Sequence, residues 1–189
     1  MDASNGNILW TYHYSKAGAP PWHHEAYHIN CITPVYHDGK LFITSGYNHT
    51  SLMFNVSGDG TEISPEWEQP VLDTHHGGVV LIDGHLYGST WINNRTGNWA
   101  CIDWETGEVK YESEWKCKGS IIACDNKLIL YEERTGYIGL VDPDPEQFRL
   151  ISSFQHKEGS GPHWAHPAVY EGILYIRHGK TLTAYRIRD

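Results

Sequence analysis

The sequence predicts an all-β protein built from four equivalent sheets. Three observations lead to this prediction: the composition, a hairpin pattern that recurs four times, and the lack of sustained helical periodicity. The 189 residues include 8 Trp, 12 Tyr and 19 Gly. Aromatic residues favour strands, and glycine favours the tight turns that join them. Because no segment repeats its apolar residues with a helical period, we expect almost no α-helix.

Each hairpin consists of a short apolar run, a tight turn and a second apolar run. The turns begin at Asp38, Asp83, Asp125 and Glu171. The repeat period is therefore 42–46 residues. An acidic residue followed by glycine or asparagine is typical of two-residue hairpin turns, in which both positions adopt positive φ. Small and β-branched residues before each turn predict an inner strand that is buried on both faces.

Each hairpin continues into two further strands, and four strands per unit at this period indicate the blade of a β-propeller. The last unit lacks its outer strand, whereas residues 1–14 have the pattern of an outer strand with no blade before it. We expect residues 1–14 to complete the last blade, because this pairing leaves no open sheet edge. The four predicted blades span residues 33–67, 77–115, 119–154 and 166–187.

A ring containing these four blades could form in three ways. The chain could close alone, two chains could form an eight-bladed ring, or the chain could be half of a longer parent. The opening residues, 1–6, have the pattern of the middle of a structural element. We therefore favour half of an eight-bladed ring from a longer parent, with a homodimer that closes the propeller as another form. A lone half-ring would expose two large apolar faces.

Two segments carry a resemblance to a known repeat. Residues 2–10 resemble the quinoprotein pattern A-x-D-x-x-T-G-x-x-x-W, with Asn5 in place of Thr. Residues 103–111 keep the Asp and the Thr-Gly turn, and end in Tyr instead of Trp. The chain thus resembles the pyrroloquinoline-quinone-like, or quinoprotein alcohol dehydrogenase-like, repeat family. That resemblance implies a propeller of seven or eight blades, in either quinone-dependent dehydrogenases or scaffold proteins of the bacterial envelope. It also implies a periplasmic or secreted location.

The loops that join one blade to the next are rich in histidine. In a propeller these loops cross one face toward the axis, and the loops between second and third strands share that face. The pattern predicts a polar pocket for an anionic or sugar-like ligand, or a histidine metal site. The alternative is that these histidines bind backbone carbonyls and cap strand ends. The predicted ligand-binding residues are His28, Asn30, His75, His76, Arg95, Arg134, His163, Trp164 and His166.

Residues 24–28 match the zinc-peptidase pattern H-E-x-x-H. That pattern requires a helix, which places both histidines on one face beside the glutamate. Here the five residues follow two prolines in a predicted loop, so we interpret the match as chance.

Charge and cysteine content exclude some classes of function. The formal net charge of −9 argues against nucleic-acid binding, which needs a basic surface. The four cysteines form no C-x-x-C pair. Cys117 and Cys124 could form a bridge, but we interpret the cysteines as small buried thiols. No apolar stretch is long enough to span a membrane, and no secretory signal opens the chain.

Two hypotheses of function follow. The first is a non-catalytic propeller that binds a small ligand or a protein partner and needs no cofactor. The second is part of a quinone-dependent alcohol or sugar dehydrogenase, which by the family resemblance would hold pyrroloquinoline quinone and calcium. In the catalytic members of that family the quinone lies between a tryptophan and, in many of them, a disulfide formed by adjacent cysteines. Trp164 could stack on such a ring, but no adjacent cysteines occur, and Glu132 and Glu133 would face opposite sides of a strand. We favour the first hypothesis.

Overall fold

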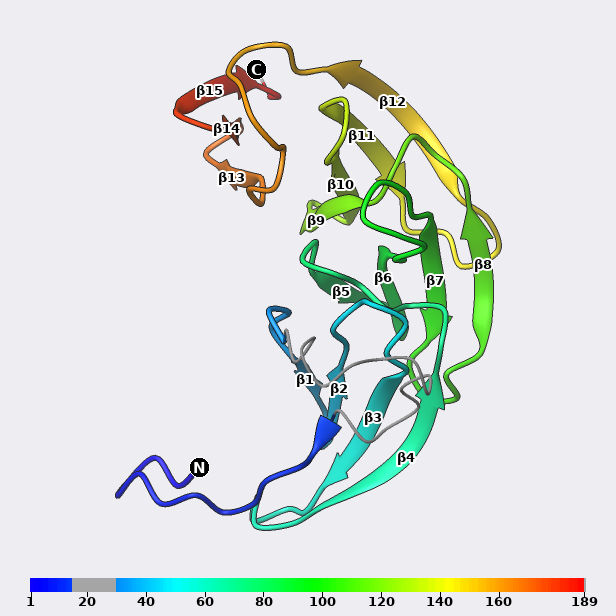
Figure 1. Ribbon diagram of the computed structural model, residues 1–189, viewed down its shortest axis with the longest axis vertical. Helices are drawn as coiled ribbons and strands as arrows, with labels where there is room; N and C mark the ends of the chain where they lie inside the picture. Colours follow the sequence, from blue (N-terminus) through cyan, green and yellow to red (C-terminus); the bar gives the residue numbers. More distant parts are fainter. Residues whose placement is uncertain (15–29, 189) are drawn as a thin grey trace.

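The computed structural model describes residues 1–14 and 30–188, and this part of the chain is all-β, as predicted. Four antiparallel sheets follow one another along a curved arc (Figure 1). In each sheet the strands pair in chain order, so each sheet is an up-and-down meander. No helix in the described residues is long and apolar enough to cross a membrane.

Three sheets have four strands and the last has three. The first sheet contains β1 (Val35–His37), β2 (Lys40–Ile43), β3 (Ser51–Val56) and β4 (Ile63–Gln69). The second contains β5 (Val79–Ile82), β6 (His85–Ser89), β7 (Trp99–Asp103) and β8 (Val109–Ser113). The third contains β9 (Gly119–Cys124), β10 (Lys127–Glu132), β11 (Tyr137–Asp142) and β12 (Arg149–Gln155). The fourth contains β13 (Ala168–Tyr170), β14 (Ile173–His178) and β15 (Thr181–Arg186).

The hairpin turn that opens each sheet has the backbone geometry expected from its residues. The first central residue has a φ of 46–47°, and the second has a φ of 54–77°. Two successive positive φ values are the signature of the type I′ turn, whose twist matches that of the strands it joins. The prediction from the turn residues is therefore confirmed. The four pairs are Asp38–Gly39, Asp83–Gly84, Asp125–Asn126 and Glu171–Gly172.

A second recurring turn leads into the outer strands. In the second sheet the amide of Asp103 donates to the carbonyl five residues later at 2.9 Å, and the amide of Gly107 donates back to the Asp103 carbonyl at 3.0 Å. Asp2 and Gly6 make the same two bonds, each at 2.8 Å. Both glycines have positive φ, +72° and +78°. The two segments that carry the sequence resemblance thus share one local structure.

The hydrophobic core lies between the sheets, in three clusters, one at each interface. The sheets approach closely there: a Cβ atom on Gly107 would lie 2.7 Å from the ring of Trp67 on the preceding sheet. The cluster between the first and second sheets contains Phe42, Met53, Leu72, Leu86, Ala100, Ile102 and Trp104. The next contains Tyr87, Trp99, Cys101, Ile121, Leu128, Leu130 and Val141. The last contains Ile129, Tyr131, Ile138, Leu174 and Ile176.

Residues 1–14 are not part of any strand, and residues 10–14 contact the first sheet. The Trp10 indole donates to the carbonyl of Gly60 at 3.1 Å, and the ring of Tyr12 packs edge-on against Phe54 at 4.7 Å. The fourth sheet lies at the opposite end of the arc (Figure 1). The segment is not paired with β15 in this structure, and its completion of the last blade stays a prediction.

Candidate functional site

A pocket of about 310 Å³ opens where three loops from different sheets meet. Asn94 and Arg95 come from the loop between β6 and β7, and Glu133 and Arg134 from the equivalent loop after β10. Trp164 comes from the connection between β12 and β13. The pocket contains three of the predicted binding residues, the two arginines and the tryptophan.

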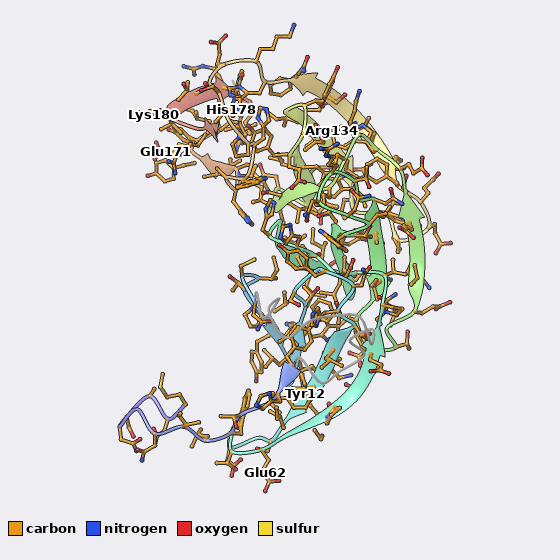
Figure 2. All side chains as sticks on the ribbon, in the orientation of Figure 1. Tyr12, Glu62, Arg134, Glu171, His178 and Lys180 are labelled. Atoms are coloured by element: carbon orange, nitrogen blue, oxygen red, sulfur yellow. The ribbon has the colours of Figure 1, made fainter. Side chains whose placement is uncertain are left out.

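Side-chain caps hold the two arginine-bearing loops in place. The Asn93 side-chain oxygen accepts the backbone amides of Arg95 and Thr96, at 2.8 and 3.1 Å. In the next sheet the Glu132 carboxylate accepts the amide of Arg134 at 2.8 Å and that of the following residue at 2.7 Å. Such local caps fix the backbone and leave the side chain of the central residue free to project. Both arginine residues are exposed, and Figure 2 labels Arg134 beside the third sheet.

A buried charged group forms the base of the pocket. The Lys118 ammonium is 2.5 Å from one carboxylate oxygen of Glu133 and 3.1 Å from the carbonyl of Asn93. The His76 imidazole lies 2.8 Å from the other oxygen. Burial alone would raise the pKa of Glu133, but the hydrogen bonds from His76 and Lys118 outweigh it and hold this pKa below its ordinary value. The carboxylate is therefore charged, with Lys118 at one oxygen and His76 within ion-pair distance of the other.

Trp164 forms one wall of the pocket. Its ring lies edge-on to the His76 ring, with the two centroids 5.6 Å apart, and Trp164 is 58% exposed. His75 packs against His76 at 4.8 Å and shares a 2.7 Å hydrogen bond with the Tyr47 hydroxyl. Burial lowers the pKa of His75 to about 4, and the charge of Lys118 contributes to the same shift. At neutral pH His75 is therefore uncharged, and its contact with His76 supports the wall that Trp164 forms.

The other predicted residues lie away from the pocket lining. His163 is buried, stacks on His178 with ring centroids 3.6 Å apart, and bonds the Tyr131 hydroxyl. His166 bonds the carbonyl of His76 at 3.0 Å. Asn30 is exposed. His28 and the H-E-x-x-H segment that ends in it fall outside the described residues.

Three residues of the site were not among the predicted binding residues: Asn94 and Glu133 in the lining, and the buried Lys118. One signal could have found the first two. Residues 93–97 read N-N-R-T-G and residues 132–136 read E-E-R-T-G, so the same R-T-G turn occurs at equivalent places in neighbouring blades. Lys118 had no such signal, because a lysine after an outer strand is usually exposed.

The adjacent acids Glu132 and Glu133 both have partners within the protein. Glu132 accepts the amides of its own turn, and Glu133 lies within ion-pair distance of Lys118 and His76. The four cysteines are free thiols; Cys101 and Cys117 are buried as expected, whereas Cys31 is exposed and Cys124 is half-buried, so the expectation was wrong for Cys31. Across residues 1–14 and 30–188, no three His, Cys, Asp or Glu side chains lie close enough together to hold a metal ion.

Comparison with known proteins identifies the fold alone. No protein-family model matches the chain, and no curated protein is significantly similar to it. Among solved structures, BamB from Moraxella catarrhalis superposes with a TM-score of 0.61 at 16% identity, over 80% of this chain and 41% of BamB. A europium-containing methanol dehydrogenase superposes with a TM-score of 0.50 at 11% identity, over 64% of this chain and 23% of the dehydrogenase. The match spans less than half the length of either protein. The predicted propeller fold is thus supported at the level of structure.

Proposed function

We propose that this chain is a non-catalytic recognition propeller whose pocket binds a sugar ring that carries an anionic group. One observation carries the proposal: Arg95 and Arg134 project from equivalent loops of neighbouring sheets into a pocket that also presents the exposed Trp164. Guanidinium groups suit carboxylates and phosphates, and a tryptophan face suits the apolar face of a ring.

The charge balance of the pocket supports an anionic ligand. Glu133 is the acidic lining residue, and Lys118 and His76 engage both of its oxygens. The two arginines therefore make the pocket cationic, on a chain whose formal net charge is −9. A local cationic site on an acidic protein concentrates anionic ligands where the field is positive.

The same contacts support a binding role over a catalytic one. A general base needs a lone pair within hydrogen-bond reach of its substrate. Both oxygens of Glu133 have protein partners, and His75 and His76 are held by Tyr47 and Glu133. The lining groups that remain open to a ligand are the arginines, Asn94 and the tryptophan, which position a ligand and do not transfer protons at neutral pH.

Calorimetric titration with glucuronate and its oligomers, against glucose, tests the proposal. We expect the anionic sugar to bind and the neutral sugar to bind much more weakly. Arg134→Gln and Arg95→Gln should each weaken binding about tenfold or more, because each removes a charge-assisted hydrogen bond. Arg177→Gln, an exposed arginine on β14 outside the pocket, is the matched control.

Three results would contradict this function. Equal affinity for glucose would show that charge plays no part, and an equal effect of Arg177→Gln would show that the pocket arginines are not specific. Dye-linked alcohol oxidation after addition of pyrroloquinoline quinone and calcium would favour an enzyme instead.

A further inference from the structure

The connection between β12 and β13 carries Trp164, the wall of the pocket, and has no regular secondary structure. We call its residues 157–167 the strap. The amide of His163 in the strap donates to the carbonyl of Glu133 over 3.4 Å, which is long for a hydrogen bond. The position of Trp164 therefore depends on the side chains that bind the strap.

His178, at the end of β14, binds the strap through both of its ring nitrogens. Its Nδ1 lies 2.8 Å from the carbonyl oxygen of Glu158, and its Nε2 lies 2.6 Å from the carbonyl oxygen of Gly161. The residue is 6% exposed, and Figure 2 labels it in the fourth sheet. One buried imidazole thus contacts both ends of a single turn in the strap.

The strap turn packs directly on the end of β14. A Cβ atom on Gly159 would lie 2.5 Å from the carbonyl oxygen of His178, and a Cβ atom on Gly179 would lie 2.1 Å from that of Ser160. Gly159 and Gly161 have φ values of +93° and +98°, in the region that favours glycine. This close fit holds the two carbonyl oxygens at the imidazole.

Only the protonated form of His178 can donate to both carbonyl oxygens. A neutral imidazole has one N–H, and its other nitrogen presents a lone pair, which a carbonyl oxygen repels. The imidazolium has two N–H groups, and its hydrogen bonds are strengthened by the charge. The observed geometry therefore corresponds to a charged His178, and loss of its proton removes one of the two bonds.

The other two imidazoles of this cluster are neutral. His163 stacks on His178 with ring centroids 3.6 Å apart, and His156 lies 6.0 Å from it. Burial, followed by the charge of His178, lowers the pKa of both His163 and His156. The titratable and charged groups around the cluster are Tyr131 and Glu132 of β10, Tyr185 of β15, Lys157 and Glu158 of the strap, and Arg177 and Lys180 beside His178 in the chain.

We propose that His178 is a proton-dependent latch, which holds the strap through two carbonyl oxygens when its ring is protonated and through one when it is not. The inference rests on the proposed function, because Trp164 directly follows His163, which stacks on His178. Histidine changes its charge between about pH 5 and pH 8. The form that fixes Trp164 is the protonated one, so the pocket binds its anionic ligand more tightly at the acidic end of this range and releases it as the pH rises.

Nuclear magnetic resonance tests the latch without any ligand. The ¹⁵N shifts of His178 should show two protonated ring nitrogens at about pH 6 and one at about pH 8. With 5-fluorotryptophan incorporated, the ¹⁹F resonance of Trp164, assigned by Trp164→Phe, should move over the same pH range. His178→Gln should abolish that movement. His156→Gln is the matched control and should keep it, because Nδ1 of His156 bonds a hydroxyl, which a neutral ring can do.

Calorimetric titration with glucuronate tests the consequence for binding. We expect the affinity to be about five- to tenfold higher at pH 6 than at pH 8, and nearly equal at the two pH values in His178→Gln. A pH dependence that survives His178→Gln would belong to His76 beside the pocket and would overturn the latch.

The two kinds of measurement separate the latch from the proposed function. A single protonated nitrogen on His178 at pH 6, or glucuronate binding that does not change with pH, would overturn the latch and leave the ligand class standing. If glucuronate bound at neither pH while the resonances of His178 and Trp164 titrated together, the ligand class would be wrong and the latch would stand.

Discussion

At the scale of single residues, Lys118 is a buried lysine between the second and third sheets. Lys118 is 1% exposed, and it joins the end of the β6–β7 loop to Glu133 through the carbonyl of Asn93. Removing one partner of a buried ion pair lowers the stability of the folded state, because the remaining charge is then buried without a partner.

We expect Lys118→Met to lower the free energy of unfolding by about 3–5 kcal/mol, since it leaves the Glu133 carboxylate buried beside His76 alone. The double variant Lys118→Met with Glu133→Leu should recover most of this loss, because no charge is then buried. Urea denaturation followed by tryptophan fluorescence measures both. A double variant no more stable than the single one would show that packing of the lysine stem, not the charge, is what matters.

His75 should make the folded state sensitive to acid. Its pKa is about 4 in the folded state against 6.5 in the unfolded chain, because burial disfavours the charged imidazole. The folded state then binds fewer protons than the unfolded one. The contribution of His75 to stability is fully present above pH 6.5 and is lost as the pH falls through 6.5 toward 4.

Thermal melts between pH 7 and pH 4 check this sensitivity. We expect His75→Gln to reduce the fall in Tm across that range, because the titrating group is gone. His37→Gln, at an exposed histidine on β1, is the control and should follow the parent curve. If both variants followed the parent curve, the acid response would belong to other groups.

At the scale of elements, the hairpin turns differ in how well their residues suit the type I′ geometry. Three of the four begin with aspartate, which tolerates positive φ, whereas the last begins with Glu171 at a φ of 47°. Aspartate and asparagine have a short polar side chain that can hydrogen-bond locally and offset the cost of positive φ, whereas the side chain of glutamate is longer.

Glu171→Asn should therefore stabilise the fourth hairpin, raising the free energy of unfolding by about 0.5–1 kcal/mol. Asp83→Asn is the control, because it exchanges two residues that both suit the turn and should change stability little. Chemical denaturation of both variants measures the difference. A loss of stability in Glu171→Asn would indicate that the glutamate makes a contact that outweighs the strain relieved.

At the scale of the whole molecule, the four sheets form a curved arc (Figure 1). Trp10 and Tyr12 contact the first sheet, and the fourth sheet has three strands. The chain covers 41% of BamB, a comparison in which the shared feature is the propeller fold. An open arc of blades leaves apolar side chains such as Tyr36, Tyr170 and Leu182 exposed at its ends.

The local parts of this structure could be predicted from sequence. Asp-Gly and Asp-Asn turns, and the Asp2 and Asp103 turns, depend on residues a few positions apart, so their backbone geometry follows from the residues themselves. Arg95, Arg134 and Trp164, which the repeat assigns to loops on one face, line one pocket in the structure.

The parts that depend on distant contacts were decided by tertiary structure. His163 has the same sequence context as the other loop histidines, yet it is buried against His178, whereas Trp164 beside it remains open to the pocket. Lys118 becomes a buried partner of Glu133 because two sheets meet there. By itself, the sequence determined the strands, the turns and the order of the blades. Burial and ion pairing, which arise only where sheets pack, decided which polar side chains are structural and which are open to a ligand.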